Sequence, residues 1–204
     1  MEVEAYVGLE DRASHARFGP TARNRVMFGP PGVAYVYLVY GMYHCLNVVT
    51  ERADRPAALL IRAVMPLDGL DAMRAARIAA SVARRRVTAA GIAAERRRIE
   101  ALDVARLAGG PGLVAAAFGL DRSWTGVDLC DPDSALRLEA APPGEGGRSG
   151  PPRIVATPRI GVDHAGEPWA SLPWRFFIAG EPSVSGGGSG GADGRRARPD
   201  EARD

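Results

Sequence analysis

All five tyrosines of this 204-residue chain lie between Tyr6 and Tyr43, and four of them fall within residues 35–43. A tyrosine offers a flat apolar face and a polar tip, which suits it to holding a planar, partly polar ligand. The same part of the chain carries polar side chains suited to chemistry, and these are Glu4, His15, Asn47 and Arg62. The combination predicts a site that holds an aromatic ring and acts on it.

Glu4 and Arg62 are charged residues embedded in apolar stretches, residues 3–7 and 58–64. A carboxylate among apolar neighbours is disfavoured unless it has a partner. The simplest resolution is that Arg62 contacts Glu4 and keeps it ionised. Such a pair is either purely structural or catalytic, because an ionised glutamate beside an aromatic cleft can act as a general base that activates water.

Three further side chains each have two interpretations. Asn47 lies in the apolar run 43–49, where an amide is costly unless it forms hydrogen bonds; it either caps a neighbouring backbone group or reads the edge of a ligand. Tyr6, which shares a strand face with Glu4, can face His15 so that the two sandwich a base. A lone histidine, however, is more often a hydrogen-bonded structural residue.

Tyr40 lies at an expected hairpin bend. Residues 33–40 and 43–50 are rich in valine and tyrosine and flank Gly41-Met42, which predicts two strands joined by a tight turn. An aromatic side chain at such a tip is poorly placed to join a core, but it can be inserted between base pairs, as minor-groove proteins do. The alternative is that Tyr40 folds back over its own hairpin.

The charge pattern is compatible with nucleic acid but does not require it. Up to Gly110 there are 16 arginines against 11 acidic residues, and the remainder has 10 arginines against 13 acidic residues, with no lysine anywhere. A guanidinium is planar and permanently charged, which suits it to phosphate. The excess in the first half is modest, and an ordinary solvated surface explains it equally well.

Cysteine, histidine and hydropathy patterns exclude several classes of protein. Cys45 and Cys130 show no CxxC spacing, which predicts reduced thiols in a cytoplasmic protein. The three histidines are scattered, so a structural zinc site is not expected. No apolar run approaches the roughly 20 residues needed to span a bilayer, and the acidic first residues do not resemble an export signal.

The remaining pattern predicts one α+β domain over residues 1–185, followed by a disordered Gly/Arg-rich tail over 186–204. Alternation predicts a strand over 2–7, and the expected elements after the hairpin are a strand over Ala57–Val64, helices over 69–86, 91–108 and 112–118, a loop over Pro142–Pro152, and strands over Ile154–Val155 and Trp174–Ala179.

Several stretches between residue 2 and about residue 185 match one known family. They are Glu2-Val-Glu4-Ala-Tyr6 with Glu10-Asp11 and His15, Thr21-Ala-Arg23-Asn24, Met27-Phe28, the run from Tyr35 to Asn47, the run from Leu60 to Gly69, Gly110-Pro-Gly112, Phe118-Gly-Leu-Asp121, Pro158-Arg-Ile-Gly161-Val and Pro173-Trp-Arg175-Phe176. In these stretches the chain resembles the alkyladenine (3-methyladenine, methylpurine) DNA glycosylase family. The tyrosine hairpin with its downstream asparagine is the most specific of the matching features.

The resemblance implies a monomer with a curved, mostly antiparallel sheet, a protruding hairpin and flanking helices. It would excise alkylated, and also deaminated, purines from double-stranded DNA without a metal or cofactor, after extruding the nucleotide from the duplex. The implied roles are catalysis for Glu4 and Arg62, the base pocket for Tyr6, His15, Tyr37 and Asn47 (with Asn47 excluding guanine), intercalation for Tyr40, and DNA contacts for Arg23, Met42 and Tyr43.

The chain departs from the family pattern in three places. Family members normally have a segment upstream of the strand of Glu4, so we expect that the true start lies upstream of Met1 and that, without it, this strand is frayed at its free end. Leu113 stands where the family usually has a lysine, so one phosphate contact is expected to be missing. The helical region 69–108 is longer than is typical.

Two other functions are alternatives to DNA glycosylase activity. The first is a DNA-binding protein that keeps the hairpin wedge and has lost competent catalysis. The second, a small-molecule binder that uses the tyrosine pocket, explains neither the exposed tip nor the arginines.

Overall fold

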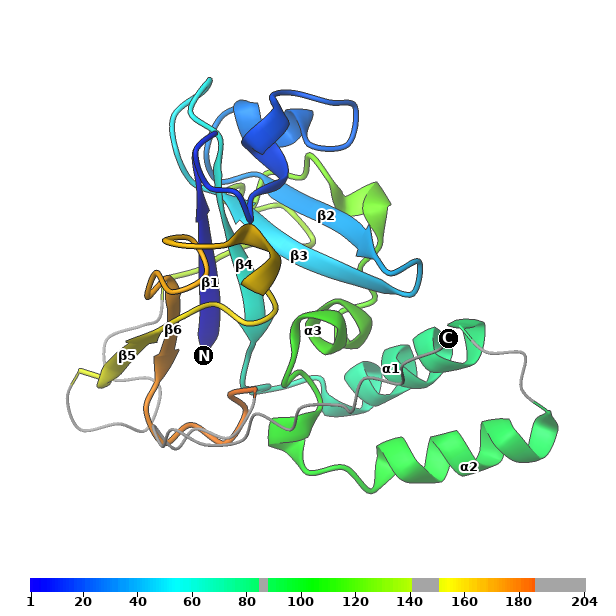
Figure 1. Ribbon diagram of the computed structural model, residues 1–204. Coiled ribbons are helices and arrows are strands. Elements are labelled where there is room, and N and C mark those ends of the chain that lie inside the picture. Colours follow the sequence, from blue (N-terminus) through cyan, green and yellow to red (C-terminus); the bar gives the residue numbers. More distant parts are fainter. Residues whose placement is uncertain (85–87, 141–150, 186–204) are drawn as a thin grey trace, which may run out of the picture.

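One antiparallel sheet organises the chain. The computed structural model describes residues 1–84, 88–140 and 151–185. Within these residues the sheet has six strands in the order β2 (Ala34–Val39), β3 (Tyr43–Val49), β4 (Ala57–Ala63), β1 (Glu2–Val7), β6 (Arg175–Ile178) and β5 (Ile154–Thr157). Helices lie to one side of it (Figure 1). The predicted α+β class and all six predicted strands are confirmed, with end residues that differ by one or two positions.

Strand β1 lies inside the sheet, where it pairs with β4 on one side and with β6 on the other. Its first residues are bonded on both sides: the Met1 nitrogen donates to the carbonyl of Ala63 at 2.8 Å, and the Ile178 amide donates to the carbonyl of Met1 at 3.1 Å. The expectation that this strand is frayed was therefore wrong. Backbone pairing on both edges fixes the strand that carries Glu4.

The two faces of the β2–β3 hairpin have different neighbours, because successive side chains of a strand point to opposite faces. Ala34 and Val36 pack with residues of β3, α3 (Pro111–Ala117) and the segment after it into a hydrophobic core. Tyr35 lies on the other face, against Met27, while Tyr37 packs beside it. In the observed register Tyr35 lies opposite Asn47 and Tyr37 opposite Cys45, so these four side chains share one face.

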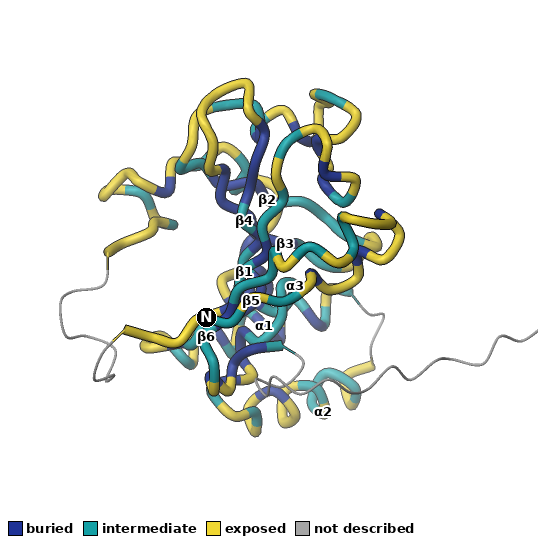
Figure 2. The backbone as a smooth tube through the Cα atoms, turned by 60° about the vertical axis from the view of Figure 1, so that its left-hand side comes forward, coloured by how far each residue is buried: buried dark blue, intermediate teal, exposed yellow. Residues whose placement is uncertain are grey.

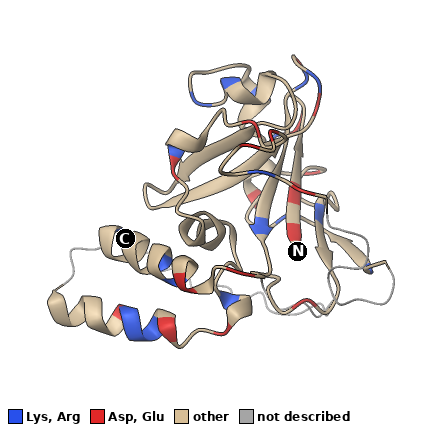
Figure 3. Ribbon diagram, turned by 180° about the vertical axis from the view of Figure 1, so that it is seen from behind, with Lys and Arg blue, Asp and Glu red and all other residues tan. Residues whose placement is uncertain are grey.

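Helices α1 (Leu70–Arg84) and α2 (Ala89–Glu100) lie side by side at the edge of the molecule, and α3 packs against β3 and β4 (Figure 1). Arginines and glutamates adjoin on α2 (Figure 3), where Arg98 and Arg96 pair with Glu95 and Glu100. Part of the arginine excess is thus neutralised locally.

The predicted helix over 91–108 was wrong at its end. Helix α2 stops at Glu100, and a separate 3₁₀ turn follows over Val104–Arg106. The side chain of Asp103 accepts a hydrogen bond from the Ala105 amide and so caps the new turn. Arg77 of α1 then donates to the carbonyls of Arg106 and Leu107 and ties this turn to the first helix.

Two buried polar residues hold the loop that follows β1. The carboxylate of Asp11 accepts from both terminal nitrogens of Arg159, at 2.6 and 2.9 Å, and neither side chain is exposed to solvent. The amide nitrogen of Asn24 donates to the carbonyls of His15 and Gly19, at 2.8 and 3.0 Å. These bonds fix the 3₁₀ turn His15–Phe18 relative to the sheet.

Burial is concentrated in the strands, whereas the loops and α2 are largely exposed (Figure 2). Among the described residues, no helix combines the length and the hydrophobicity that a membrane crossing requires. Most of the predicted loop over Pro142–Pro152 and the predicted tail lie outside the described residues.

The Asp11–Arg159 pair generates a stability prediction. Because removing one member of a buried ion pair leaves the other charge unpaired, we expect Asp11→Asn to lower the free energy of unfolding by about 3 kcal/mol. Urea titration followed by circular dichroism measures this change. Asp71→Asn is the matched control, since the Asp71 carboxylate is solvent-exposed and lies 3.6 Å from Arg74. Equal losses in the two variants would contradict the prediction.

Candidate active site

A cavity of about 590 Å³ opens on the tyrosine face of the hairpin. Most of the residues singled out in the sequence line it: Tyr6, His15, Arg23, Tyr37, Tyr40, Asn47 and Arg62. They come from β1, the loop after it, the hairpin and β4, so the fold brings together side chains separated by as many as 56 positions. A cavity of this size is ordinary for a binding site of a small planar group.

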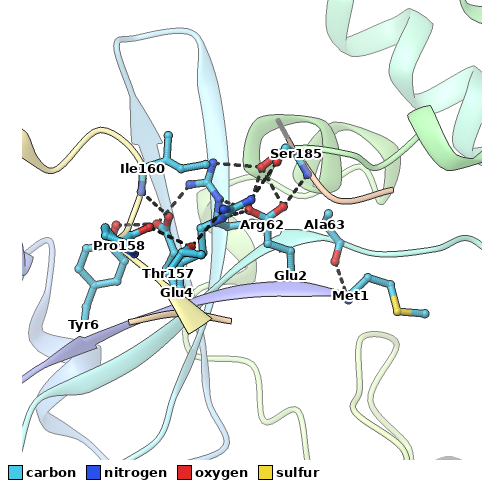
Figure 4. A network of polar contacts seen from close by, with 11 residues as sticks. Met1, Glu2, Glu4, Tyr6, Arg62, Ala63, Thr157, Pro158, Ile160 and Ser185 are labelled. Carbon is cyan, nitrogen blue, oxygen red and sulfur yellow. Dashed lines mark hydrogen bonds and ion pairs between the residues drawn. The ribbon is translucent and has the colours of Figure 1, made fainter. Parts of the chain in front are cut away.

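Glu4 lies behind Tyr6 and has no solvent-exposed surface. Its Oε1 accepts from the Ile160 amide at 2.7 Å, and its Oε2 accepts from the Tyr6 hydroxyl at 3.0 Å and lies 3.2 Å from Nη1 of Arg62 (Figure 4). The expected contact between Glu4 and Arg62 is therefore present. Burial and the neighbouring carboxylate raise the pKa of Tyr6, so its hydroxyl stays protonated and donates.

A second buried carboxylate, Glu2, shares Arg62 with Glu4. Oε1 of Glu2 accepts from Nε of Arg62 at 2.9 Å and from Nε of Arg175 at 2.6 Å, and Oε2 accepts from the Ser185 amide at 2.7 Å. Burial acts to raise the pKa of Glu2, but the hydrogen bonds from Arg175 and Ser185 outweigh it and hold that pKa below its usual value. The sequence analysis gave Glu2 and Arg175 no role.

His15 is held against the hairpin tyrosines. Its Nδ1 lies 3.0 Å from the Tyr35 hydroxyl, and its ring meets the Tyr37 ring edge-on with centroids 4.4 Å apart. Burial, reinforced by Arg23 and Arg17, lowers the pKa of His15 to about 4. The imidazole is therefore neutral near pH 7. His15 and Tyr6 line the same cavity, and their sandwiching of a base stays a prediction.

Asn47 is anchored by its amide nitrogen, which donates to the carbonyl of Tyr35 at 3.0 Å and to that of Cys45 at 3.4 Å. The capping interpretation is thus confirmed. Only Nδ2 can donate to two carbonyls, so these bonds fix which way the amide faces. The side chain is a rigid part of the cavity wall, and its reading of a ligand edge stays a prediction.

The hairpin tip presents Tyr40 to solvent, with 85% of its surface exposed. Tyr40 and Gly41 have φ values of 52° and 66°, and the Met42 amide donates to the carbonyl of Val39 at 3.1 Å. Positive φ at both central positions is typical of a type I′ turn, which matches the twist of the flanking strands. The alternative that Tyr40 folds back over its hairpin is wrong.

The three predicted DNA contacts differ in their surroundings. The guanidinium of Arg23 lies 5.2 Å from the Tyr37 ring centroid at the cavity rim, and Met42 is exposed at the hairpin tip. Tyr43 instead packs against α3, where a Cβ on Gly112 would lie 2.9 Å from its ring, and the Arg84 guanidinium lies 4.7 Å from the ring centroid. Arg23 and Met42 are thus more accessible than Tyr43.

The sequence analysis missed two further features of the site. Arg159 is stacked between the rings of Tyr6 and Trp174, at 4.6 and 5.0 Å, and it immediately precedes Ile160, whose amide binds Glu4. Phe18, 81% exposed, lines the cavity and lies under the guanidinium of Arg17. Arg175, like Arg62, is a charged residue within an apolar strand. The pattern that identified Arg62 in the sequence therefore also applies to Arg175.

The lowered pKa of His15 predicts a pH effect on stability. Between pH 6.5 and about 4 the unfolded chain binds a proton at this position and the folded chain does not. The contribution of neutral His15 is therefore complete above pH 6.5 and is lost as the pH falls toward 4. Urea titrations of the wild type and of His15→Gln at pH 7.5, 5.5 and 4.5 should show a difference in unfolding free energy that shrinks on acidification. A constant difference would contradict it.

Comparisons with known proteins agree with this arrangement. The model of the family described as "Methylpurine-DNA glycosylase (MPG)" matches residues 1–182. A candidate 3-methyladenine DNA glycosylase of Methanocella arvoryzae is 44% identical over 185 residues, which cover 91% of this chain and 78% of that protein. A candidate 3-methyladenine DNA glycosylase of Bacillus cereus is 39% identical over 186 residues, which cover 91% of this chain and 81% of that protein.

A relative from Mus musculus extends the comparison to mammals. It is named DNA-3-methyladenine glycosylase and is 42% identical over 186 residues, which cover 91% of this chain and 50% of that protein. The resemblance noted in the sequence is confirmed by these matches. The chain therefore belongs to the methylpurine-DNA glycosylase family and is a DNA glycosylase.

Proposed function

We propose that the protein, acting as a monomer, extrudes alkylated purines from double-stranded DNA and hydrolyses their N-glycosidic bond with a water activated by Glu4. The observation that carries this proposal is the placement of Glu4, a carboxylate without solvent exposure behind a tyrosine-lined cavity. The glycosidic carbon of a stacked nucleotide is out of reach, so a buried base of this kind requires a nucleotide that leaves the duplex.

Glu4 has the hydrogen bonds that a general base needs. Arg62 supplies the positive charge that favours the ionised carboxylate, and the Ile160 amide and Tyr6 hydroxyl fix its orientation. Glu4 takes a proton from the water while the water oxygen bonds to C1′ of the sugar. The C1′–N bond breaks with its electron pair moving to the base, which neutralises the positive charge of an alkylated purine.

The cavity wall favours a cationic planar base. Electron-rich faces of Tyr6 and Tyr37 attract a positive charge by cation–π interaction, and a normal uncharged base gains less. His15 has a pKa of about 4, so at neutral pH it is uncharged and does not repel the cation. Selection for alkylated purines then follows from charge as well as from shape.

Asn47 provides a second selection by shape. Its amide is fixed by bonds to two backbone carbonyls, so it cannot withdraw from a purine that carries an exocyclic 2-amino group. Guanine would meet this wall, whereas adenine derivatives and hypoxanthine lack the group. The fixed amide is therefore compatible with excision of deaminated adenine in addition to alkylated purines.

Tyr40 would fill the gap left by the extruded nucleotide. Its exposure and its short, closed turn suit insertion into a base stack. Arg23 at the cavity rim and the exposed Met42 would contact the flanking DNA, so binding should weaken with salt.

Glu4→Gln tests the proposed mechanism. We expect release of free base from a duplex with one hypoxanthine or one ethenoadenine to fall by about 100-fold or more, because general-base catalysis contributes on that order. Single-turnover assays that quantify abasic sites measure the rate, and gel shift measures retained DNA binding. Binding without base release by the wild type as well would instead favour the non-catalytic DNA-binding protein, and full activity of Glu4→Gln would exclude Glu4 as the base.

Tyr40→Ala tests the wedge. A stacked base–aromatic contact contributes about 1–3 kcal/mol, so we expect binding to the lesion-containing duplex to weaken by about 10-fold or more, with slower excision. Tyr40→Phe keeps the ring and is the matched control, which should stay close to the wild type. Unchanged binding and kinetics in Tyr40→Ala would remove Tyr40 from this role.

A further inference from the structure

Glu2 is a buried carboxylate that the proposed reaction does not use. Only 1% of its surface is exposed, and hydrogen-bond donors from three distant parts of the chain converge on it. Arg62 and Arg175 each donate Nε to Oε1, the Ser185 amide donates to Oε2, and the Ser185 hydroxyl lies 2.8 Å from both oxygens. So many donors around one carboxylate mean that it is ionised and immobile.

The guanidinium of Arg62 contacts two carboxylates and a serine. Its Nε donates to Glu2 at 2.9 Å, its Nη1 lies 3.2 Å from Oε2 of Glu4, and its Nη2 donates to the Ser185 hydroxyl at 3.4 Å. A guanidinium is a rigid planar fork, so fixing Nε and Nη2 fixes the direction of Nη1. Glu4 consequently lies at ion-pair distance from Nη1 of Arg62 and does not receive the paired hydrogen bonds that a free arginine offers a carboxylate.

This arrangement leaves Glu4 with acceptor capacity for the reacting water. A carboxylate has about four acceptor positions, and among the described residues Glu4 accepts hydrogen bonds from the Ile160 amide and the Tyr6 hydroxyl, with Nη1 of Arg62 at ion-pair distance. If Arg62 turned both terminal nitrogens toward Glu4, their hydrogen bonds would fill the remaining positions. Glu4 would then be a weaker base.

We propose that Glu2 is a positioning residue for base excision, which holds the Arg62 guanidinium so that Nη1 stays at ion-pair distance from Glu4 and the guanidinium does not close on it as a paired fork. The proposal rests on the proposed role of Glu4 as the general base. Glu2 is suited to this task because it lies two residues before Glu4 on the same face of β1, so that one arginine of β4 reaches both.

The charges around the two carboxylates set the direction of the expected effects. Arg62 faces them from β4 and Arg175 from β6, and the Met1 ammonium lies near Glu2 at the start of β1. Glu181 lies near that ammonium.

On the cavity side, the uncharged Tyr6 hydroxyl faces Glu4. Arg159 lies over the Tyr6 ring, and its charge is matched by Asp11. Glu2 and Arg175 are therefore the two charges in this network that can be altered without changing the groups that contact Glu4 directly.

Two substitutions should shift the pH dependence of base release in opposite directions. Glu2→Gln removes a negative charge and frees the Arg62 fork, so the pH of half-maximal release on the acidic side should fall by about one unit, with a plateau rate about 10-fold lower. Arg175→Gln removes a positive charge and leaves Arg62 as the only arginine paired with Glu2. The pH of half-maximal base release on the acidic side should therefore rise. Single-turnover release of hypoxanthine and ethenoadenine between pH 5 and 9 measures both.

A purely structural role predicts a different pattern, because loss of packing lowers the rate at every pH and does not move the midpoint in two directions. Glu51→Gln is the matched control: it removes one exposed glutamate, and its midpoint should equal that of the wild type. Urea titration at each pH shows that the folded fraction is constant. The proposal would be overturned if the pH of half-maximal release is unchanged in Glu2→Gln and Arg175→Gln, or if both substitutions move it in the same direction.

The two proposals fail in different ways. If the acidic limb of the wild-type profile persists in Glu4→Gln, the general-base assignment fails. If that limb is lost in Glu4→Gln but is unmoved in Glu2→Gln, only the role of Glu2 fails. Should Glu2→Gln not fold, Arg175→Gln decides alone, since a raised midpoint supports the proposal and an unchanged one overturns it.

Discussion

The structure depends on keeping two carboxylates buried side by side on one strand. An unpaired charge in the interior is too costly to persist. Glu2 and Glu4 are both paired, because the neighbouring strands supply Arg62 and Arg175 and the segment that ends at Ser185 supplies further donors to Glu2. The register of β1 against its neighbours is therefore a functional constraint, since a slip of one residue would turn Glu2, Glu4 and Tyr6 to the opposite face.

The hairpin serves stability with one face and the site with the other. Ala34 and Val36 join the core under α3, whereas Tyr35 and Tyr37 turn toward the cavity. Because side chains of a strand alternate, the packing of the first pair fixes the position of the second pair. The cavity wall therefore owes its rigidity to the core behind it, and Asn47 adds two bonds to backbone carbonyls on the same face.

Local patterns in the sequence sufficed for the strands, the hairpin and the contact between Glu4 and Arg62. They did not reveal the partners of Glu2, because Arg175 and Ser185 lie more than 170 positions away and reach it only through the pairing of β1 with β6. They also missed the end of α2, where Asp103 caps a new turn in a stretch whose composition is still that of a helix. Interactions within a few residues were predictable, and so was the pairing of two opposite charges embedded in apolar strands, whereas the contacts that depend on the position of β6 were not.

The hairpin tip places a bulky residue where backbone sterics disfavour one. A side chain other than glycine at positive φ costs about 1–2 kcal/mol, and Tyr40 adopts φ of 52° while gaining almost no burial. Stability alone would select asparagine or glycine at this turn position. The tight turn does, however, hold the ring on a short and rigid support, and rigidity lowers the entropy lost when a side chain is ordered against a partner. A wedge needs this property, so the proposed insertion of Tyr40 into DNA would account for strain that folding alone does not favour.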